Sequence, residues 1–277
     1  MSAGRMTMQE ALYERPGPKT KKKIAIFTII TIILIAILLG VVIYQFYING
    51  QLDKKYWYFF LRLSTWKFLG KGLIGTIEAA VLAGVMTFIL GFLYMLARIS
   101  PYKILNWIGT ALVEFTRGVP TLLFVYFFFL VAPQFGINLP SILRISLPVA
   151  ISASGIVAEV LRTGINAIPK GQREAALSLG LTNAKVFLKI VFPQAFRYVI
   201  PSLISEMVIV VKDTTFAYVV NFPDLLQNAR VFISNYDAML SVYLFVAIIY
   251  ILINYALNKL AVYVNERNKA GIKERRG

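Results

Sequence analysis

The sequence predicts an all-α, polytopic membrane protein, and two observations carry that prediction. First, 58% of its 277 residues are hydrophobic, including 20 Phe and 15 Tyr, which exceeds the apolar share of a soluble domain. Second, six apolar windows approach the roughly 20 residues that cross a bilayer as a helix. These windows are 24–48, 73–97, 119–132, 145–168, 195–211 and 239–264. They indicate one polytopic domain in which the third span is the shortest.

The charge distribution predicts the orientation of the spans. The chain has 29 basic and 13 acidic residues, a net charge of +16, but the basic residues cluster at span ends and not on a soluble module that would bind nucleic acid. Most of them lie on one side if the tails 1–23 and 265–277 and the 168–193 loop are all cytoplasmic. The basic segment 49–71 would then face outward, against the rule, and its aromatic content predicts an interfacial helix.

The composition excludes several kinds of chemistry on this chain. Cysteine and histidine are absent, which excludes disulfides, Cys or Ser-His-Asp nucleophiles and histidine proton relays, and leaves no zinc site. The G-x-G-x-x-G match at 70–75 follows no buried strand, and no phosphate-binding G-x-x-x-x-G-K-[ST] loop is present. We therefore expect no catalytic, cofactor-binding or metal-binding residue here, and nucleotide binding must come from another chain.

The loop 168–193 is the most informative stretch of the sequence. It reads IPKGQREAALSLGLTNAKVFLKIVFP, and its good helix formers predict a short helix over 172–179. Gly180 supplies the left-handed residue that ends such a helix, and Thr182 is a candidate N-cap for the next one. The small apolar face of this helix, Ala175, Ala176 and Leu179, cannot be buried within its own loop, so a partner protein or the lipid interface must cover it.

The fourth span combines a packing surface with an ion pair. Ala150, Ser154 and Ala158 recur every four residues, a small-residue stripe that allows close helix packing. Glu159 and Arg162 lie three residues apart near the predicted inner end, a spacing at which their side chains can pair.

The fifth span carries candidates for a translocation pathway. Pro201 frees a backbone carbonyl, which is tolerated where protein or a watery cavity covers it. Glu206 is ionisable within the membrane and indicates either the pathway or a hydrogen bond at a subunit interface. Lys212 and Asp213 close the span at the predicted outer face, where Lys212 either snorkels to the interface or attracts an anionic substrate. The candidate pathway or gate residues are Glu159, Glu206, Lys212, Asp213 and Thr214.

Four segments resemble one family of transport proteins. The spacing E-A-A, then Gly180, then Ile190 and Pro193 resembles the E-A-A-x3-G-x9-I-x-L-P loop of ABC importer membrane subunits, with Phe192 at the Leu. The segments 114–120 (EFTRGVP), 158–180 and 192–220 are similar to polar amino acid permeases, with departures at Val119, Thr163, Ser205, Thr215 and Phe216. The N-terminal part of the chain has a more specific resemblance, to the second membrane subunit of actinobacterial glutamate importers. It is carried by residues 12–23, the long span after them and NGQLD at 49–53.

This resemblance implies a type I ABC permease fold with a five-span core at 72–264, preceded by one extra span within 24–71. It implies an importer for a polar amino acid, above all glutamate, or else glutamine or aspartate. The partners would be an ABC ATPase dimer that binds ATP-Mg, a second homologous permease subunit that forms a heterodimer, or else a homodimer, an extracellular binding protein and membrane lipid. The ATPase-coupling loop would comprise Gly171, Gln172, Arg173, Glu174, Ala175, Ala176, Leu177 and Gly180.

The residues alone leave two other classes of protein open. An ion-coupled secondary transporter would use Glu78, Glu159 and Glu206 as a relay, although inverted repeats are not evident in the two halves. A membrane enzyme is the weaker alternative because histidine and cysteine are absent. Uptake that survives ATP depletion while an ion gradient is kept would favour the secondary transporter.

Overall fold

The computed structural model describes residues 17–274, apart from the side chains of 264, 265 and 267–274. The predicted cytoplasmic tails therefore lie largely outside the described residues. The chain divides into two units at Trp57 and Tyr58. The first contains α2 (Pro18–Ile48) and the short 3-10 helix η1 (Lys54–Tyr56). Helix α2 is apolar on all sides and has no buried residue, as expected of a single membrane-spanning helix.

The second unit, which begins at Tyr58, consists of helices and the short loops that connect them in its described residues. Its longest helices are α3 (Leu63–Arg98), α6 (Ser141–Asn166), α9 (Phe192–Asp213) and α11 (Met239–Glu274). The shorter elements are η2 (Tyr58–Leu61), α4 (Lys103–Gly118), α5 (Thr121–Tyr126), η3 (Phe127–Val131), η4 (Ala132–Phe135), α7 (Lys170–Ser178), α8 (Asn183–Val186), η5 (Phe187–Val191), η6 (Thr214–Val220) and α10 (Leu225–Tyr236).

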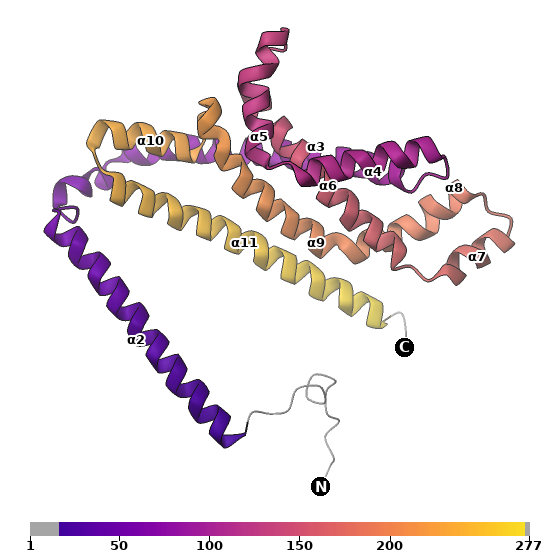
Figure 1. Ribbon diagram of the computed structural model, residues 1–277, viewed down its shortest axis with the longest axis horizontal. Coiled ribbons are helices and arrows are strands. Elements are labelled where there is room, and N and C mark those ends of the chain that lie inside the picture. Colours follow the sequence, from indigo (N-terminus) through magenta and orange to yellow (C-terminus); the bar gives the residue numbers. More distant parts are fainter. Residues whose placement is uncertain (1–16, 275–277) are drawn as a thin grey trace. The chain divides into compact units, whose positions relative to one another are not determined.

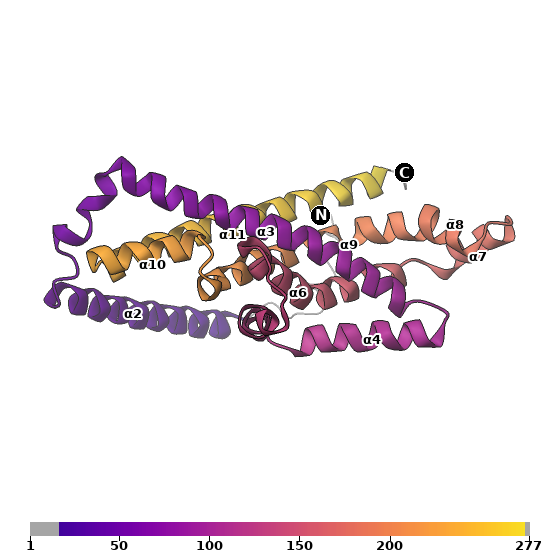
Figure 2. The same cartoon turned by 90° about the horizontal axis from the view of Figure 1, so that it is seen from above.

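The helices of this unit form a bundle with two distinct ends. Helix α3 packs along α6, α6 against α9, and α9 against α11. Figures 1 and 2 show α7 and α8 at one end of the bundle and α10 at the opposite end. We call these the loop end and the α10 end. Helix α5 projects away from the long helices in Figure 1, and the segment Thr121–Phe135, which α5 begins, is bent by 97° from α4.

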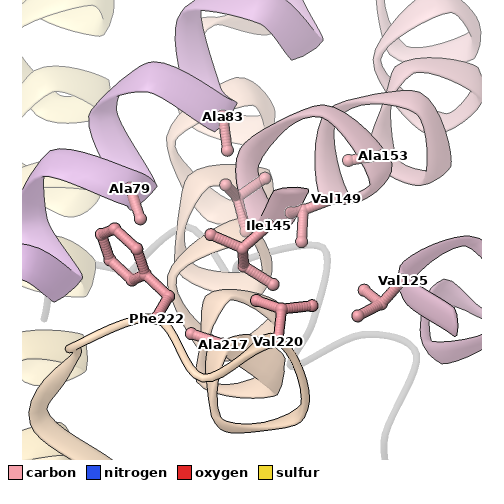
Figure 3. Packing of buried hydrophobic residues seen from close by; sticks show 10 residues of the cluster. Ala79, Ala83, Val125, Ile145, Val149, Ala153, Ala217, Val220 and Phe222 are labelled. Atoms are coloured by element: carbon pink, nitrogen blue, oxygen red, sulfur yellow. The ribbon is translucent and has the colours of Figure 1, made fainter. Parts of the chain in front are cut away.

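The core lies where α3, α5, α6 and η6 meet (Figure 3). Small residues of α3, Ala79 and Ala83, face Ile145 and Val149 of α6, and Phe222 closes the cluster from the segment after η6. Ser146 donates a hydrogen bond of 3.1 Å to the carbonyl oxygen of Ala79. The small side chains let the helices approach closely, which is how helices associate in a bilayer without a hydrophobic driving force.

The predicted small-residue stripe on α6 is part of this packing. Ala150, Ser154 and Ala158 are all buried. A Cβ at Gly91 of α3 would lie 2.9 Å from the carbonyl oxygen of Ser154 and 2.7 Å from Val157 Cγ1. Glycine is therefore required at position 91 for the observed distance between α3 and α6.

The structure changes the expected number of spans. Among the described residues, four helices are long and apolar enough to cross a membrane: Pro18–Ile48, Leu63–Arg98, Ser141–Asn166 and Met239–Tyr263. The bent pair Lys103–Gly118 and Thr121–Phe135 makes a fifth if it is one broken span. The predicted span 195–211 lies in α9, which is not one of these helices.

The segment 49–71 does not form the predicted interfacial helix. It contains η1 and η2, and α3 already begins at Leu63, well before the expected span at 73. One aromatic residue of this segment serves internal packing: Phe59 is fully buried, with its ring centroid 4.9 Å from that of Phe232 and 5.4 Å from that of Tyr236 in α10.

Candidate functional site

The local structure predicted for the 168–193 loop is present. Helix α7 covers Lys170–Ser178, and Gly180 follows it with φ of 79°. The hydroxyl of Thr182 accepts a hydrogen bond of 3.4 Å from the backbone N–H of Lys185, which caps α8 as predicted. The left-handed glycine and the capping threonine turn the chain sharply, so α7 projects at the loop end of the bundle.

The expectation that this loop cannot bury its own apolar face is wrong for one residue. Ala176 is 3% exposed and packs against Val186 and Val191 of the following segment. Leu177 and Leu179 are 38% and 82% exposed. Ala176 therefore anchors α7 to its own chain, because α8 and η5 fold back onto it, while the two leucines leave an apolar surface uncovered at the loop end.

Polar contacts join other residues of the predicted coupling loop to the segments that follow it. Arg173 Nη2 donates to Asn183 Oδ1 at 3.2 Å, and Gln194 Nε2 donates to Gln172 Oε1 at 2.7 Å. The exposed residues of the predicted coupling loop are Gly171, Gln172, Arg173, Glu174, Ala175, Leu177 and Gly180. A cavity of about 590 Å³ lies beside the helix, lined among others by Lys170 and Arg173.

Glu159 is the centre of a cluster of ion pairs where α3, α4 and α6 meet. Its carboxylate accepts hydrogen bonds from Arg98 of α3, from Arg117 of α4 at 3.5 Å and from Arg162 at 2.9 Å. Glu114 lies 3.4 Å from Arg98 and 3.9 Å from Arg117. The predicted pair of Glu159 with Arg162 is confirmed, and the two arginines from other helices were not predicted.

Arg117 lies in the last turn of α4, directly before a sharp bend in the chain. Helix α4 packs along α3 and α6, and the segment Thr121–Phe135 that follows is bent by 97° from α4. Arg117 reaches across α6, where a Cβ on Gly155 would lie 2.9 Å from Arg117 Cγ.

Two cavities flank Arg117. One, of about 510 Å³, is lined by Arg117, Glu159, Thr163, Tyr198 and Ser202 together with apolar side chains. The other, of about 300 Å³, is lined by the bend 116–121 and by Ser152, Glu206 and Asp213. We call them the Glu159 cavity and the Glu206 cavity.

The Glu206 cavity brings two of the predicted pathway residues together with two that were not predicted. Thr121 Oγ1 donates a hydrogen bond of 2.8 Å to Asp213 Oδ2 and lies 2.9 Å from Ser152 Oγ. Glu206 is 5% exposed, and its Oε1 has no hydrogen-bond partner within the part of the chain that the structure describes. Ser152 precedes Glu159 by seven residues, so the shared face of α6 could have indicated it. Thr121 could not have been found without the bend.

These contacts also correct the predicted depth of Lys212 and Asp213. The pair was expected at the outer face, but Asp213 reaches Thr121 and, through it, Ser152. Because Ser152 lies near the middle of α6, Asp213 lies at mid-helix depth and not at the α10 end. Lys212 is exposed and does not line either cavity. Thr214 is fully buried, and its hydroxyl donates to the carbonyl oxygen of Val211 at 2.8 Å.

A buried polar cluster, which was not predicted, fixes the segment after η6 to α3 at the α10 end. Asp224 is fully buried and accepts a hydrogen bond of 2.7 Å from the backbone N–H of Gln227. Thr76 of α3 accepts one of 3.0 Å from the N–H of Leu225. Burial raises the pKa of the Asp224 carboxyl to about 6, although backbone N–H groups and Tyr250 act to lower it.

The fold and the EAA-type loop define a class. The family described as the binding-protein-dependent transport system inner membrane component matches residues 87–270, and the chain belongs to that family. The chain is therefore a multi-pass inner-membrane protein and a permease subunit of an ABC importer for polar amino acids. Permease subunits are transport components without catalysis, and the partner ATPase binds the ATP.

Named relatives carry amino acids. The chain is 34% identical over 230 residues to the glutamate transport system permease protein GluD of Corynebacterium glutamicum, covering 80% of this chain and 83% of that protein. It is 35% identical over 196 residues to the probable glutamine permease GlnM of Bacillus subtilis, covering 71% and 91%. It is 29% identical over 208 residues to the glutamate/aspartate import permease GltK of Escherichia coli, covering 72% and 93%.

Solved structures share the fold. The crystal structure of an amino acid ABC transporter with histidines matches with a TM-score of 0.70 at 29% identity, covering 76% of this chain and 98% of that one. An inward-facing structure of the MetNI methionine transporter matches with a TM-score of 0.59 at 17% identity, covering 73% and 99%. The second likeness shows the fold alone.

Proposed function

We propose that this subunit carries glutamate, with glutamine and aspartate as the nearest alternatives. The similarity to the glutamate permease GluD over most of both chains supports this choice, and so does the resemblance of 12–23 and 49–53 to glutamate importers. An extracellular binding protein delivers the amino acid to this subunit and a second, homologous permease subunit, with which it forms a heterodimer.

Coupling to ATP hydrolysis takes place at α7. The observation that supports this most directly is a helix anchored to its own chain by Ala176 that leaves Leu177 and Leu179 uncovered at the loop end. The ATPase dimer covers this surface, and movement of α7 is transmitted to α6 and α9, which flank the loop. Gly171, Gln172, Arg173 and Glu174 contribute the polar contacts.

The translocation pathway runs through the Glu206 cavity and the Glu159 cavity. Glu159, Glu206 and Asp213 line them, whereas Lys212 and Thr214 act beside the pathway. The permease core is the segment 72–264, with one additional span in 24–71. Both termini and the 168–193 loop face the cytoplasm.

Transport by the complete importer tests this proposal. The chain is co-expressed with its ATPase, second permease and binding protein and reconstituted in proteoliposomes. Uptake of labelled glutamate should require ATP and the binding protein, and unlabelled glutamine and aspartate should compete less well than glutamate itself. Uptake driven by an ion gradient without ATP would instead support a secondary transporter.

A further inference from the structure

We propose that Arg117 binds the α-carboxylate of the amino acid as it passes, and that Glu159 holds the guanidinium when no substrate is present. This inference rests on the proposed pathway through the two cavities. Arg117 contributes to the lining of both of them, and it is the one cation among the described residues that line either.

The backbone places Arg117 for this role. The side chain crosses α6 at Gly155, where the missing Cβ leaves room for Arg117 Cγ, and its Nη1 lies 3.5 Å from Glu159 Oε1. Gly155 and Glu159 are four residues apart and share one face of α6. The guanidinium is therefore supported from α6, although it belongs to the last turn of α4.

The ion cluster contains one more positive than negative charge. Three guanidinium groups, those of Arg98, Arg117 and Arg162, surround Glu159, and Glu114 is the only other carboxylate of the cluster among the described residues. Arg98 and Arg162 do not line either cavity. The Arg117 contact with Glu159, at 3.5 Å, is longer than that of Arg162, at 2.9 Å. Arg117 can therefore move from Glu159 to a ligand, because Arg98 and Arg162 still pair with the Glu159 carboxylate.

Acidic residues in the lining of the Glu206 cavity match the other end of an amino acid. Glu206 is 5% exposed and lines the cavity, its Oε1 has no hydrogen-bond partner among the described residues, and Asp213 is held there by Thr121. Two carboxylates and a guanidinium in one cavity lining suit an ammonium and a carboxylate on one α-carbon, because charge-assisted hydrogen bonds are about twice as strong as neutral ones. The two carboxylates would repel an anion that lacks the ammonium group.

Equilibrium binding to the assembled permease and ATPase complex, without the binding protein, tests the inference. Tritiated L-glutamate is displaced by unlabelled L-glutamate or by L-isoglutamine, its α-amide, which keeps the γ-carboxylate. The wild-type complex should prefer the α-carboxylate by about 10- to 100-fold, the range expected of one charged hydrogen bond. Arg117→Gln should reduce this preference to below about 3-fold, and Arg117→Lys should give an intermediate value because it keeps the charge without the planar fork.

Arg162→Gln is the matched control. It removes another guanidinium from Glu159 but lines neither cavity, so the preference should stay within about 2-fold of wild type, well short of the loss of a charged hydrogen bond. If Arg117 acts only by stabilising Glu159, both variants will behave alike. Should Arg117→Gln fail to assemble, Arg117→Lys decides the question.

Three results would overturn the inference: unchanged preference in the Arg117 variants, equal binding of both ligands to the wild type, and no displaceable binding to the wild type. ATP-driven uptake by the wild type is measured in parallel. If that uptake is normal while the preference does not depend on Arg117, only this inference fails. If the uptake does not occur, the proposed function fails with it.

Discussion

At the scale of single residues, Gly180 shows how one backbone conformation determines the loop. Its φ of 79° lies in the left-handed region, and, its two chain neighbours aside, no atom of the described residues lies within 4 Å of where a Cβ would be. Strain on substitution would therefore come from the backbone alone and not from a clash. A β-branched residue tolerates this region poorly, whereas asparagine adopts it several-fold more often than other residues.

We predict that Gly180→Val uncouples transport and that Gly180→Asn does so far less. The valine should cost about 1–3 kcal/mol at this position and tilt α7. The measurement is glutamate uptake per ATP hydrolysed by the reconstituted importer. Equal coupling ratios for Val, Asn and wild type would show that the orientation of α7 does not matter.

Asp224 is the residue whose titration should affect stability. Its pKa is raised from 3.8 to about 6 in the folded protein, so the folded state binds a proton more tightly than the unfolded state. The group therefore stabilises the fold fully below about pH 4, and this contribution is lost as the pH rises to about 6.

We predict that Asp224→Asn removes this dependence, because asparagine also caps a helix but does not titrate. The difference in Tm between mutant and wild type in detergent should increase in favour of the mutant from pH 4 to pH 7. A difference that is constant over this range would mean that Asp224 titrates alike in both states.

At the scale of helices, packing between α3 and α6 depends on glycine at one position and not at another. We predict that Gly91→Ala destabilises the protein by about 1–3 kcal/mol, since the new methyl group would overlap Val157 and the backbone of Ser154. Gly70→Ala is the control: outside the local backbone of α3, no atom of the described residues lies within 4 Å of where its Cβ would be, so it should stabilise α3 by about 0.5–1 kcal/mol. Thermal unfolding in detergent measures both, and equal effects would contradict the packing described here.

Elements set by local sequence were predictable, and those set by distant contacts were not. The helix at α7, its glycine and the Thr182 cap follow from neighbouring residues. The mid-helix depth of Asp213 depends on Thr121, 92 residues away, and no local pattern reveals it. The burial of Ala176 likewise depends on the fold of α8 and η5 back onto α7. Arg117 was recognised within a motif, yet its contact with Glu159 required the packing of α4 on α6.

At the scale of the whole molecule, the proposed roles require the loop end to face the cytoplasm and the α10 end to face outward. The basic segment 49–71 argues against that orientation. Exposed serines allow a direct test, because the chain contains no cysteine and serine to cysteine changes little in size. Ser178 lies at the end of α7, Ser141 at the start of α6, and Ser234 in α10; all three are exposed.

The most direct measurement is labelling of Ser178→Cys with an impermeant maleimide. The account predicts that this cysteine is unreactive in intact cells, reacts in inside-out vesicles and is protected there when the ATPase subunit is added. Ser141→Cys and Ser234→Cys should react in intact cells, which shows that the reagent reaches the outer surface. Labelling of Ser178→Cys in intact cells, or reaction in vesicles that the ATPase does not slow, would contradict the claim that α7 couples this permease to ATP hydrolysis.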